Sequence, residues 1–373
     1  MMSHLRQIPT LEGPFLHDLL GSAACHLGVP GYVEDLVGLP QASKYVVVLV
    51  DGLGWENLAQ WAKEAPFLAA ALTGSRPLVT DLPSTTAASL VGLWTGMGPG
   101  RHGVLGFSFE AAERIVSPRY PHITTPLFLS TPLPTPTSVL DTCVEDTVKV
   151  TSVVPMDQVQ SGFTLMGTRR ATMAPVTSMH GQERVTYVGD ACKAERALVY
   201  VYEPRLDHAG HADGVGSSQW VKALGKVDRF VETLRWSLGA DVCLLVTGDH
   251  GMVNVARHDR WVIESKPDLA RDVRLVGGEA RFRHLYTDRP DRVASRWRDV
   301  MGDQAYVLTR AEAIDSGVFG PVEPHFQFRI GDVVVVCEGE WAILTRTFSG
   351  EFTMVGMHGG CTTAERLVPL LIM

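Results

Sequence analysis

Three short apolar runs, each followed within a few residues by an aspartate, recur along this chain. They cover residues 45–50, 197–202 and 242–246 and read YVVVLV, ALVYVY and VCLLV. An apolar run without alternation is typical of a strand that is buried on both faces, as in a parallel sheet. Because helical patterns such as 55–64 and 217–237 separate the runs, the sequence predicts an α/β sandwich of three layers with a mostly parallel central sheet.

Metal-ligating side chains gather where these predicted strands end. Asp51 directly follows the first run, and the neighbours Asp249 and His250 follow the third. Asp207 and His211 follow the second run at a spacing of four residues, which places both on one face of a helix. Since ligands of open α/β sheets bind beyond the carboxyl ends of the strands, we expect these side chains to share one site.

Each piece of this pattern also has an ordinary structural explanation. Asp51 can cap the following helix, and Asp249-His250 can be a polar turn between glycines. Together with His358 in GMHGG, however, the chain offers three carboxylates and three imidazoles, enough for two sets of three ligands. Mixed nitrogen and oxygen ligands suit zinc, with manganese or iron as alternatives. Two such ions ~3.5–4 Å apart can clamp the attacking and leaving oxygens of an in-line displacement.

Hydroxyl side chains crowd the predicted start of a helix over residues 87–94. Ser84, Thr85 and Thr86 follow Pro83 there. Such residues are common helix caps, which is the structural explanation. The functional explanation is a nucleophile at the positive end of a helix, where an anion also binds.

Composition excludes several other classes of protein. The net charge is −8 and Lys and Arg form no long runs, so nothing favours nucleic-acid binding. The six cysteines include no CxxC pair, which indicates buried thiols rather than disulfides or a zinc knuckle. Neither a signal-peptide core near the N-terminus nor a run of ~18 apolar residues occurs. We therefore expect a soluble, cytoplasmic protein without a membrane partner.

The pattern changes along the chain and suggests a division into three parts. Residues 1–40 form a leader packed on the core, and residues 41–272 and 336–373 form the catalytic core. Residues 273–335, with predicted strands at 280–286 and 305–308 around a helix at 291–301, form a small inserted α+β cap that could shape the pocket.

The order and spacing of five motifs resemble the alkaline phosphatase superfamily, most closely its nucleotide pyrophosphatase/phosphodiesterase branch. The motifs are VVVLVDGLG, LPSTTAASLVGLWTGMGPGRHGVLG, YEPRLDHAGH, VTGDHGM and GMHGG, and they extend over residues 45–251 and 356–360. The resemblance implies an alkaline phosphatase-like fold, two zinc ions and a small phosphoester substrate, possibly a nucleotide.

The resemblance also implies roles for individual residues. The position of the family's nucleophile falls at Thr86, whose hydroxyl would be deprotonated by metal coordination and form a covalent phospho-threonine intermediate. The backbone N–H of Ala87 would donate to a phosphoryl oxygen. The implied ligands of the two zinc ions are Asp207, His211 and His358 for one, and Asp51, Asp249 and His250 for the other.

One position departs from the family pattern. Counted from His102-Gly103, the Asn with which the family binds a phosphoryl oxygen falls at Phe107, which cannot donate a hydrogen bond. Lower activity, a different substrate or a substitute side chain would each follow from this change. Phe107 could also sandwich a base with Trp55, although buried aromatic side chains are usually structural.

Three functions are consistent with these residues. The first is a two-metal phosphodiesterase or nucleotide pyrophosphatase. The second is a phosphomonoesterase or phosphonate hydrolase on the same scaffold, and a monoesterase usually needs an extra cationic group for the second negative charge. The third, from another class, is a metal-binding regulatory protein without turnover, an alternative that the change at Phe107 keeps open.

Overall fold

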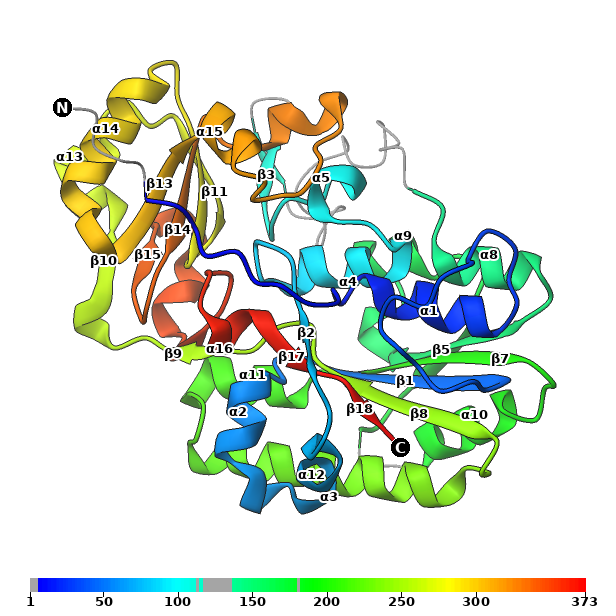
Figure 1. Cartoon of the computed structure of the whole chain (residues 1–373). Helices are drawn as coiled ribbons and strands as arrows, with labels where there is room; N and C mark the ends of the chain where they lie inside the picture. Colours follow the sequence, from blue (N-terminus) through cyan, green and yellow to red (C-terminus); the bar gives the residue numbers. More distant parts are fainter. Residues whose placement is uncertain (1–5, 112–113, 117–135, 180–181) are drawn as a thin grey trace.

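A sheet of six strands runs through the lower part of the molecule in Figure 1, a computed structural model that describes residues 6–111, 114–116, 136–179 and 182–373. Five strands are parallel, and β18 pairs antiparallel with β8 at one edge. The strand order is β18 (Leu371–Ile372), β8 (Val242–Thr247), β1 (Lys44–Val50), β7 (Ala197–Glu203), β5 (Lys149–Pro155) and β6 (Thr172–Val176). The predicted, mostly parallel sheet is therefore confirmed.

Strand β1 shows why the apolar runs do not alternate. Its odd-numbered residues from Tyr45 to Leu49 pack into one apolar cluster and its even-numbered residues from Val46 to Val50 into another, on opposite faces of the sheet. Helices cover both faces and complete the three layers (Figure 1). On one face lie α1 (Asp18–His26), α4 (Thr86–Thr95) and α8 (Val139–Glu145), and on the other lie α3 (Pro66–Leu72), α10 (Glu183–Ala191) and α12 (Ser218–Ser237).

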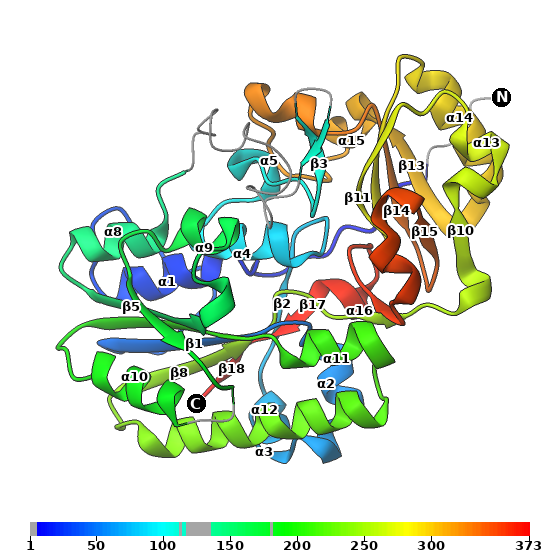
Figure 2. The same ribbon diagram turned by 180° about the vertical axis from the view of Figure 1, so that it is seen from behind.

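A second sheet, antiparallel throughout, lies beside the first and is seen from behind in Figure 2. Its order is β11 (Leu275–Glu279), β12 (Phe282–Tyr286), β14 (Val333–Cys337) and β13 (Ala305–Thr309). Helix α14 (Pro290–Met301) packs on it. The prediction of one strand over 280–286 was wrong at its start, because residues 280 and 281 form the turn between β11 and β12.

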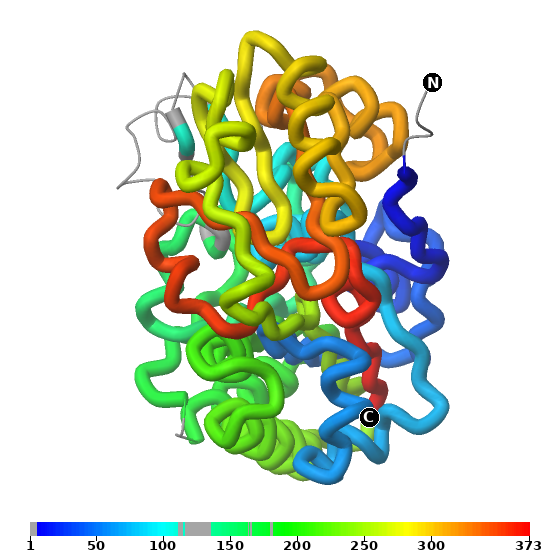
Figure 3. Tube along the Cα trace, turned by 90° about the vertical axis from the view of Figure 1, so that its left-hand side faces the viewer, coloured from blue at the N-terminus to red at the C-terminus, as the bar shows by residue number. Residues whose placement is uncertain are grey.

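The predicted cap, residues 273–335, supplies most of this second sheet. Strand β14 crosses its predicted boundary at 335, so the division into domains stays a prediction. Figure 3 shows the red C-terminal segment running between the upper and lower parts of the molecule. Two small sheets lie along this junction: β9 (Val253–Asn254) with β16 (Gly356–Met357), and β10 (Arg260–Val262) with β15 (Ala342–Leu344).

Two further expectations concern the cysteines and the membrane. All six cysteines are free thiols, and five of them are buried, in agreement with the prediction. Among the described residues, no helix combines the length and the apolar character that crossing a lipid bilayer requires.

Candidate two-metal active site

The carboxyl ends of three neighbouring strands deliver five of the six predicted metal ligands. Asp51 directly follows β1, and Asp249 and His250 follow β8, its neighbour in the sheet. Helix α11 (Arg205–Asp213) begins after β7 and presents Asp207 and His211 on one face, with Oδ1 and Nε2 of the two side chains 3.3 Å apart. The sixth ligand, His358, arrives from the far end of the chain after β16.

The structure brings these residues into two compact groups. Within each group, the possible ligand atoms all lie within 4.8 Å of one another. The rings of His250 and His358, one from each group, stack with centroids 3.6 Å apart, so the groups are adjacent. The groups are Asp207, His211 and His358, and Asp51, Asp249 and His250, the two sets that the family resemblance implies.

The three histidines are oriented for binding a metal through Nε2. Each Nδ1 faces a backbone carbonyl oxygen, and because a carbonyl oxygen only accepts, Nδ1 carries the hydrogen. Each Nε2 then carries the lone pair that can bind a cation. The Nδ1–O distances are 2.9 Å from His211 to Gly356, 3.0 Å from His250 to Gly251 and 3.0 Å from His358 to Ser84.

The carboxylates lack a partner that neutralises them. One oxygen each of Asp51, Asp207 and Asp249 is buried with no hydrogen-bond partner among the described residues. Burial, together with Asp207 and Asp249 nearby, raises the pKa of Asp51 well above its usual range. Burial, followed by repulsion from His250 and His211, lowers the pKa of His358 well below its usual range. Unpaired buried charge is unfavourable, so this donor set fits divalent cations.

Thr86, the predicted nucleophile, lies at the first turn of α4. Its Oγ1 is 3.1 Å from Nε2 of His250, next to the second ligand set. Ala87 follows it, also at the start of this helix, where backbone N–H groups have no partner within the helix. The Thr86 hydroxyl therefore lies beside the ligand groups, at the same end of the helix as Ala87.

A cavity of about 810 Å³ opens over the site. Thr86, Leu90 and Trp94, spaced four residues apart on one face of α4, line it together with Tyr200 and Tyr202 of β7. The hydroxyl of Tyr202 donates to the carboxylate of Asp51, which joins this wall to the ligand groups.

Both predicted substrate-binding residues, Ala87 and Phe107, also line the cavity. Among the described residues that line the cavity, Trp55 is absent. The suggested stacking of a base between Phe107 and Trp55 therefore lacks one of its two rings. The roles assigned to Ala87 and Phe107 stay predictions.

Sequence reasoning missed Glu279, which reaches the cavity from β11 of the second sheet. Its Oε2 lies 3.6 Å from Nδ1 of His358, and its Oε1 has no hydrogen-bond partner among the described residues. Burial raises the pKa of Glu279 well above its usual range. No motif marks this residue, because its place in the site depends on how the two sheets pack.

Comparison with known proteins gives both a family and similar structures. No curated protein sequence matches the chain. Murine ectonucleotide pyrophosphatase/phosphodiesterase 5, as an inactive variant in complex with AMP, is 15% identical, with a TM-score of 0.65 over 88% of this chain and 87% of that one. The human protein is also 15% identical, with a TM-score of 0.62 over 88% and 87%. Phosphonoacetate hydrolase from Sinorhizobium meliloti 1021, in complex with phosphonoformate, is 17% identical, with a TM-score of 0.61 over 89% and 90%.

At these identities the solved structures establish the fold, and the family is established by sequence. The model of the type I phosphodiesterase / nucleotide pyrophosphatase family matches residues 45–360, which is most of the chain. The chain therefore belongs to this family of the alkaline phosphatase superfamily and is a hydrolase that acts on phosphoester bonds.

Proposed function

We propose that this hydrolase is a two-metal phosphodiesterase or nucleotide pyrophosphatase that uses Thr86 as its nucleophile. The observation that carries this proposal is the position of the Thr86 hydroxyl, 3.1 Å from Nε2 of His250, beside two adjacent groups of three ligands each. The murine relative in complex with AMP supports a substrate derived from a nucleotide. A cytoplasmic location remains a prediction from the sequence.

The two ligand groups would each hold one divalent ion, zinc first, with manganese or iron as alternatives. Bound there, such ions would lower the pKa of the threonine hydroxyl and stabilise charge on the leaving oxygen. Thr86 Oγ1 forms a bond to phosphorus while the bond to the leaving oxygen breaks, and the proton that Oγ1 loses passes through solvent to the leaving oxygen. Water then attacks phosphorus, the Oγ1–P bond breaks, and the hydroxyl is restored. The N–H of Ala87 would donate to a phosphoryl oxygen.

The charges around the cavity favour a diester over a monoester. No Lys or Arg is among the described residues that line the cavity. A monoester dianion carries one more negative charge than a diester and gains most from an extra cationic side chain. A diester or pyrophosphate linkage therefore suits this cavity better.

A phosphonate hydrolase is the second candidate, and the likeness to phosphonoacetate hydrolase in complex with phosphonoformate supports it. Phe107 in the cavity wall is the one feature that favours a binding protein without turnover, because it replaces a donor expected in the family. These alternatives are separated by their substrates and by the effect of changing Thr86.

The test compares hydrolysis of bis-p-nitrophenyl phosphate with that of p-nitrophenyl phosphate by chelated protein to which zinc or manganese is restored. We expect metal-dependent turnover with preference for the diester. Thr86→Ala should lower kcat at least about 100-fold, because it removes the nucleophile, yet leave two metal ions bound.

Thr86→Ser is the matched control, since it keeps a hydroxyl and should retain part of the activity. Preference for the monoester would instead assign a phosphatase. Two bound metal ions without turnover on either ester would assign a binding protein.

A further inference from the structure

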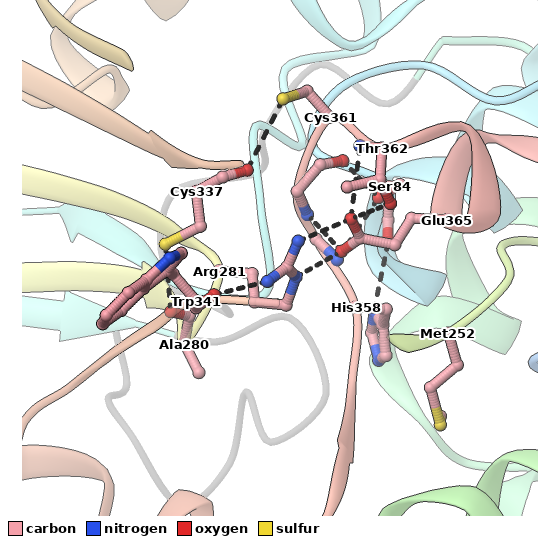
Figure 4. Close-up of polar contacts among 12 residues, drawn as sticks. Ser84, Met252, Ala280, Arg281, Cys337, Trp341, His358, Cys361, Thr362 and Glu365 are labelled. Atoms are coloured by element: carbon pink, nitrogen blue, oxygen red, sulfur yellow. Dashed lines mark hydrogen bonds and ion pairs between the residues drawn. The ribbon is translucent and has the colours of Figure 1, made fainter. Parts of the chain in front are cut away.

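A buried arginine–glutamate pair joins the second sheet to the loop that carries His358 (Figure 4). Arg281 lies in the turn between β11 and β12, and Glu365 lies in α16 (Thr363–Arg366). Nε of Arg281 is 2.6 Å from Oε1 of Glu365, and Nη2 is 2.8 Å from Oε2. Both side chains are 0% exposed, so the pair is bidentate and fully excluded from water.

Glu365 also holds both loops that supply histidine ligands. Its Oε1 accepts the backbone N–H of Gly360, two residues after His358, at 2.8 Å. Its backbone carbonyl oxygen accepts the N–H of Gly251, next to His250, at 2.8 Å. One residue thus contacts a loop of each ligand group.

The loop of His358 packs directly on this pair. A Cβ atom on Gly360 would lie 2.8 Å from Nη2 of Arg281 and 2.9 Å from Oε2 of Glu365, so only glycine fits between them. Ser84 holds the loop from the other side, since its Oγ donates to the carbonyl of Gly360 at 2.8 Å and accepts the N–H of Gly359 at 3.2 Å. The backbone near His358 is therefore fixed by the pair and by the segment that precedes Thr86.

Stability alone explains this pair poorly. A buried ion pair has to offset the loss of hydration of two charges, and apolar residues of similar volume often replace one without loss of stability. Glu365 contacts the backbone of both ligand loops, although its Oε2 also accepts from Thr362 and Arg281 also donates to the carbonyls of Gly339 and Trp341.

We propose that Arg281 and Glu365 are positioning residues that fix the loop of His358 and so set the metal affinity of the group Asp207, His211 and His358. The inference rests on the proposed two-metal function. Residues that orient metal ligands in this way typically contribute about 10- to 100-fold to metal affinity.

Two double variants separate positioning from mere stability. Arg281→Met with Glu365→Met removes both charges together and leaves the N–H of Gly360 without an acceptor. Arg281→Met with Glu365→Gln also removes both charges but keeps an acceptor oxygen for Gly360. The metal-stripped full-length variants are titrated with zinc in competition with a chelator, and the thermal unfolding of each metal-free form is recorded.

We expect the wild type to bind two zinc ions per chain. The double methionine variant should bind one of them about 10- to 100-fold more weakly, and the methionine–glutamine variant should recover most of that affinity. Arg283→Met is the control, because Arg283 forms another buried pair, with Glu351, and among the described residues this pair makes no hydrogen bond or ion pair with the His358 loop. It should leave both zinc affinities unchanged.

The proposal would be overturned if both zinc sites of the double methionine variant kept the wild-type affinity. It would also be overturned if both double variants lost zinc affinity to the same extent. If neither double variant folds, Arg281→Lys keeps the charge but loses the bidentate contact, and unchanged zinc affinity there would overturn the proposal too. A wild type that binds fewer than two zinc ions would instead contradict the proposed function itself.

Discussion

Phe107 is the residue at which the sequence is expected to depart from the family pattern, and it lines the same cavity as Thr86. A missing donor to the phosphoryl oxygen costs transition-state stabilisation, since such donors are typically worth about 100- to 1,000-fold in kcat. We therefore expect Phe107→Asn to raise kcat/KM for bis-p-nitrophenyl phosphate at least about tenfold in the zinc-loaded protein.

Phe107→Leu serves as the control, because it enlarges the cavity in the same place without adding a donor. Equal gains in both variants would assign the effect to space rather than to hydrogen bonding. No gain in the asparagine variant would mean that another group already binds this oxygen.

At the scale of single residues, the candidate metal ligands could be predicted from the sequence. The residues that contact and hold the ligand loops could not. Asp51, Asp249 and His250 each come within a few residues of a strand end, so the pattern of the sheet brings them together. Arg281 and Glu365 lie 84 residues apart and meet only because the second sheet packs against α16. Nothing in the local sequence of either residue marks such a contact.

At the scale of the element, one face of α4 forms the cavity wall next to Thr86. Leu90 lies one turn after Thr86 on the cavity wall and Trp94 two turns after it. Leu90→Trp should fill the part of the cavity along α4. The kcat/KM for bis-p-nitrophenyl phosphate should then fall about tenfold relative to that for the smaller methyl p-nitrophenyl phosphate. Leu90→Met conserves volume and should leave the ratio unchanged.

The ratio of the two specificity constants is the measurement, and thermal unfolding shows whether the tryptophan variant is still folded. An equal fall in kcat/KM for both substrates would show that the α4 face does not select substrates by size, because it would indicate damage to Thr86 or its surroundings.

The ends of a strand could be predicted where both of its faces are buried. Each apolar run of the main sheet became a strand within about a residue of its predicted bounds, because both faces of the strand are covered by helices. The β11–β12 hairpin was missed because β11 contains Gly277 and Gly278, which suggest a loop. Gly278 has a positive φ of 80° within that strand.

At the scale of the whole molecule, His284 connects the second sheet to the loop after α5 (Pro99–His102). Its Nε2–H donates to the carbonyl of Leu105 at 2.8 Å, and its Nδ1 accepts the N–H of Gly331 at 3.1 Å. Burial lowers the pKa of His284 to about 4, so the folded protein keeps it neutral.

Stability should therefore fall as pH falls from about 6.5 toward 4, because the unfolded chain binds a proton there that the folded chain does not. From pH 7 to pH 5 this residue costs about 2 kcal/mol of the free energy of unfolding. Urea denaturation at pH 7 and pH 5 measures how much free energy of unfolding is lost between the two pH values. This loss should be about 2 kcal/mol smaller in His284→Gln than in the wild type.

His258, whose side chain is 84% exposed, offers the control, and His258→Gln should show the wild-type loss. Identical pH dependence in His284→Gln and the wild type would show that His284 titrates normally in the folded protein.

The whole fold class could be predicted from the sequence because strand, helix and ligand patterns all agree on an α/β sandwich. The placement of the second sheet could not, since it depends on long-range contacts such as those of Arg281 and His284. That placement brings Glu279 into the cavity.

The late position of His358 also has a consequence for biosynthesis. The group Asp51, Asp249 and His250 is complete once His250, three residues after β8, has been translated, whereas the other group waits for a residue near the far end of the sequence. If each group holds a metal ion as proposed, a nascent chain can acquire one of the two ions well before the other. Premature termination just after His250 would leave a polypeptide that has the first ligand group but lacks His358 of the second.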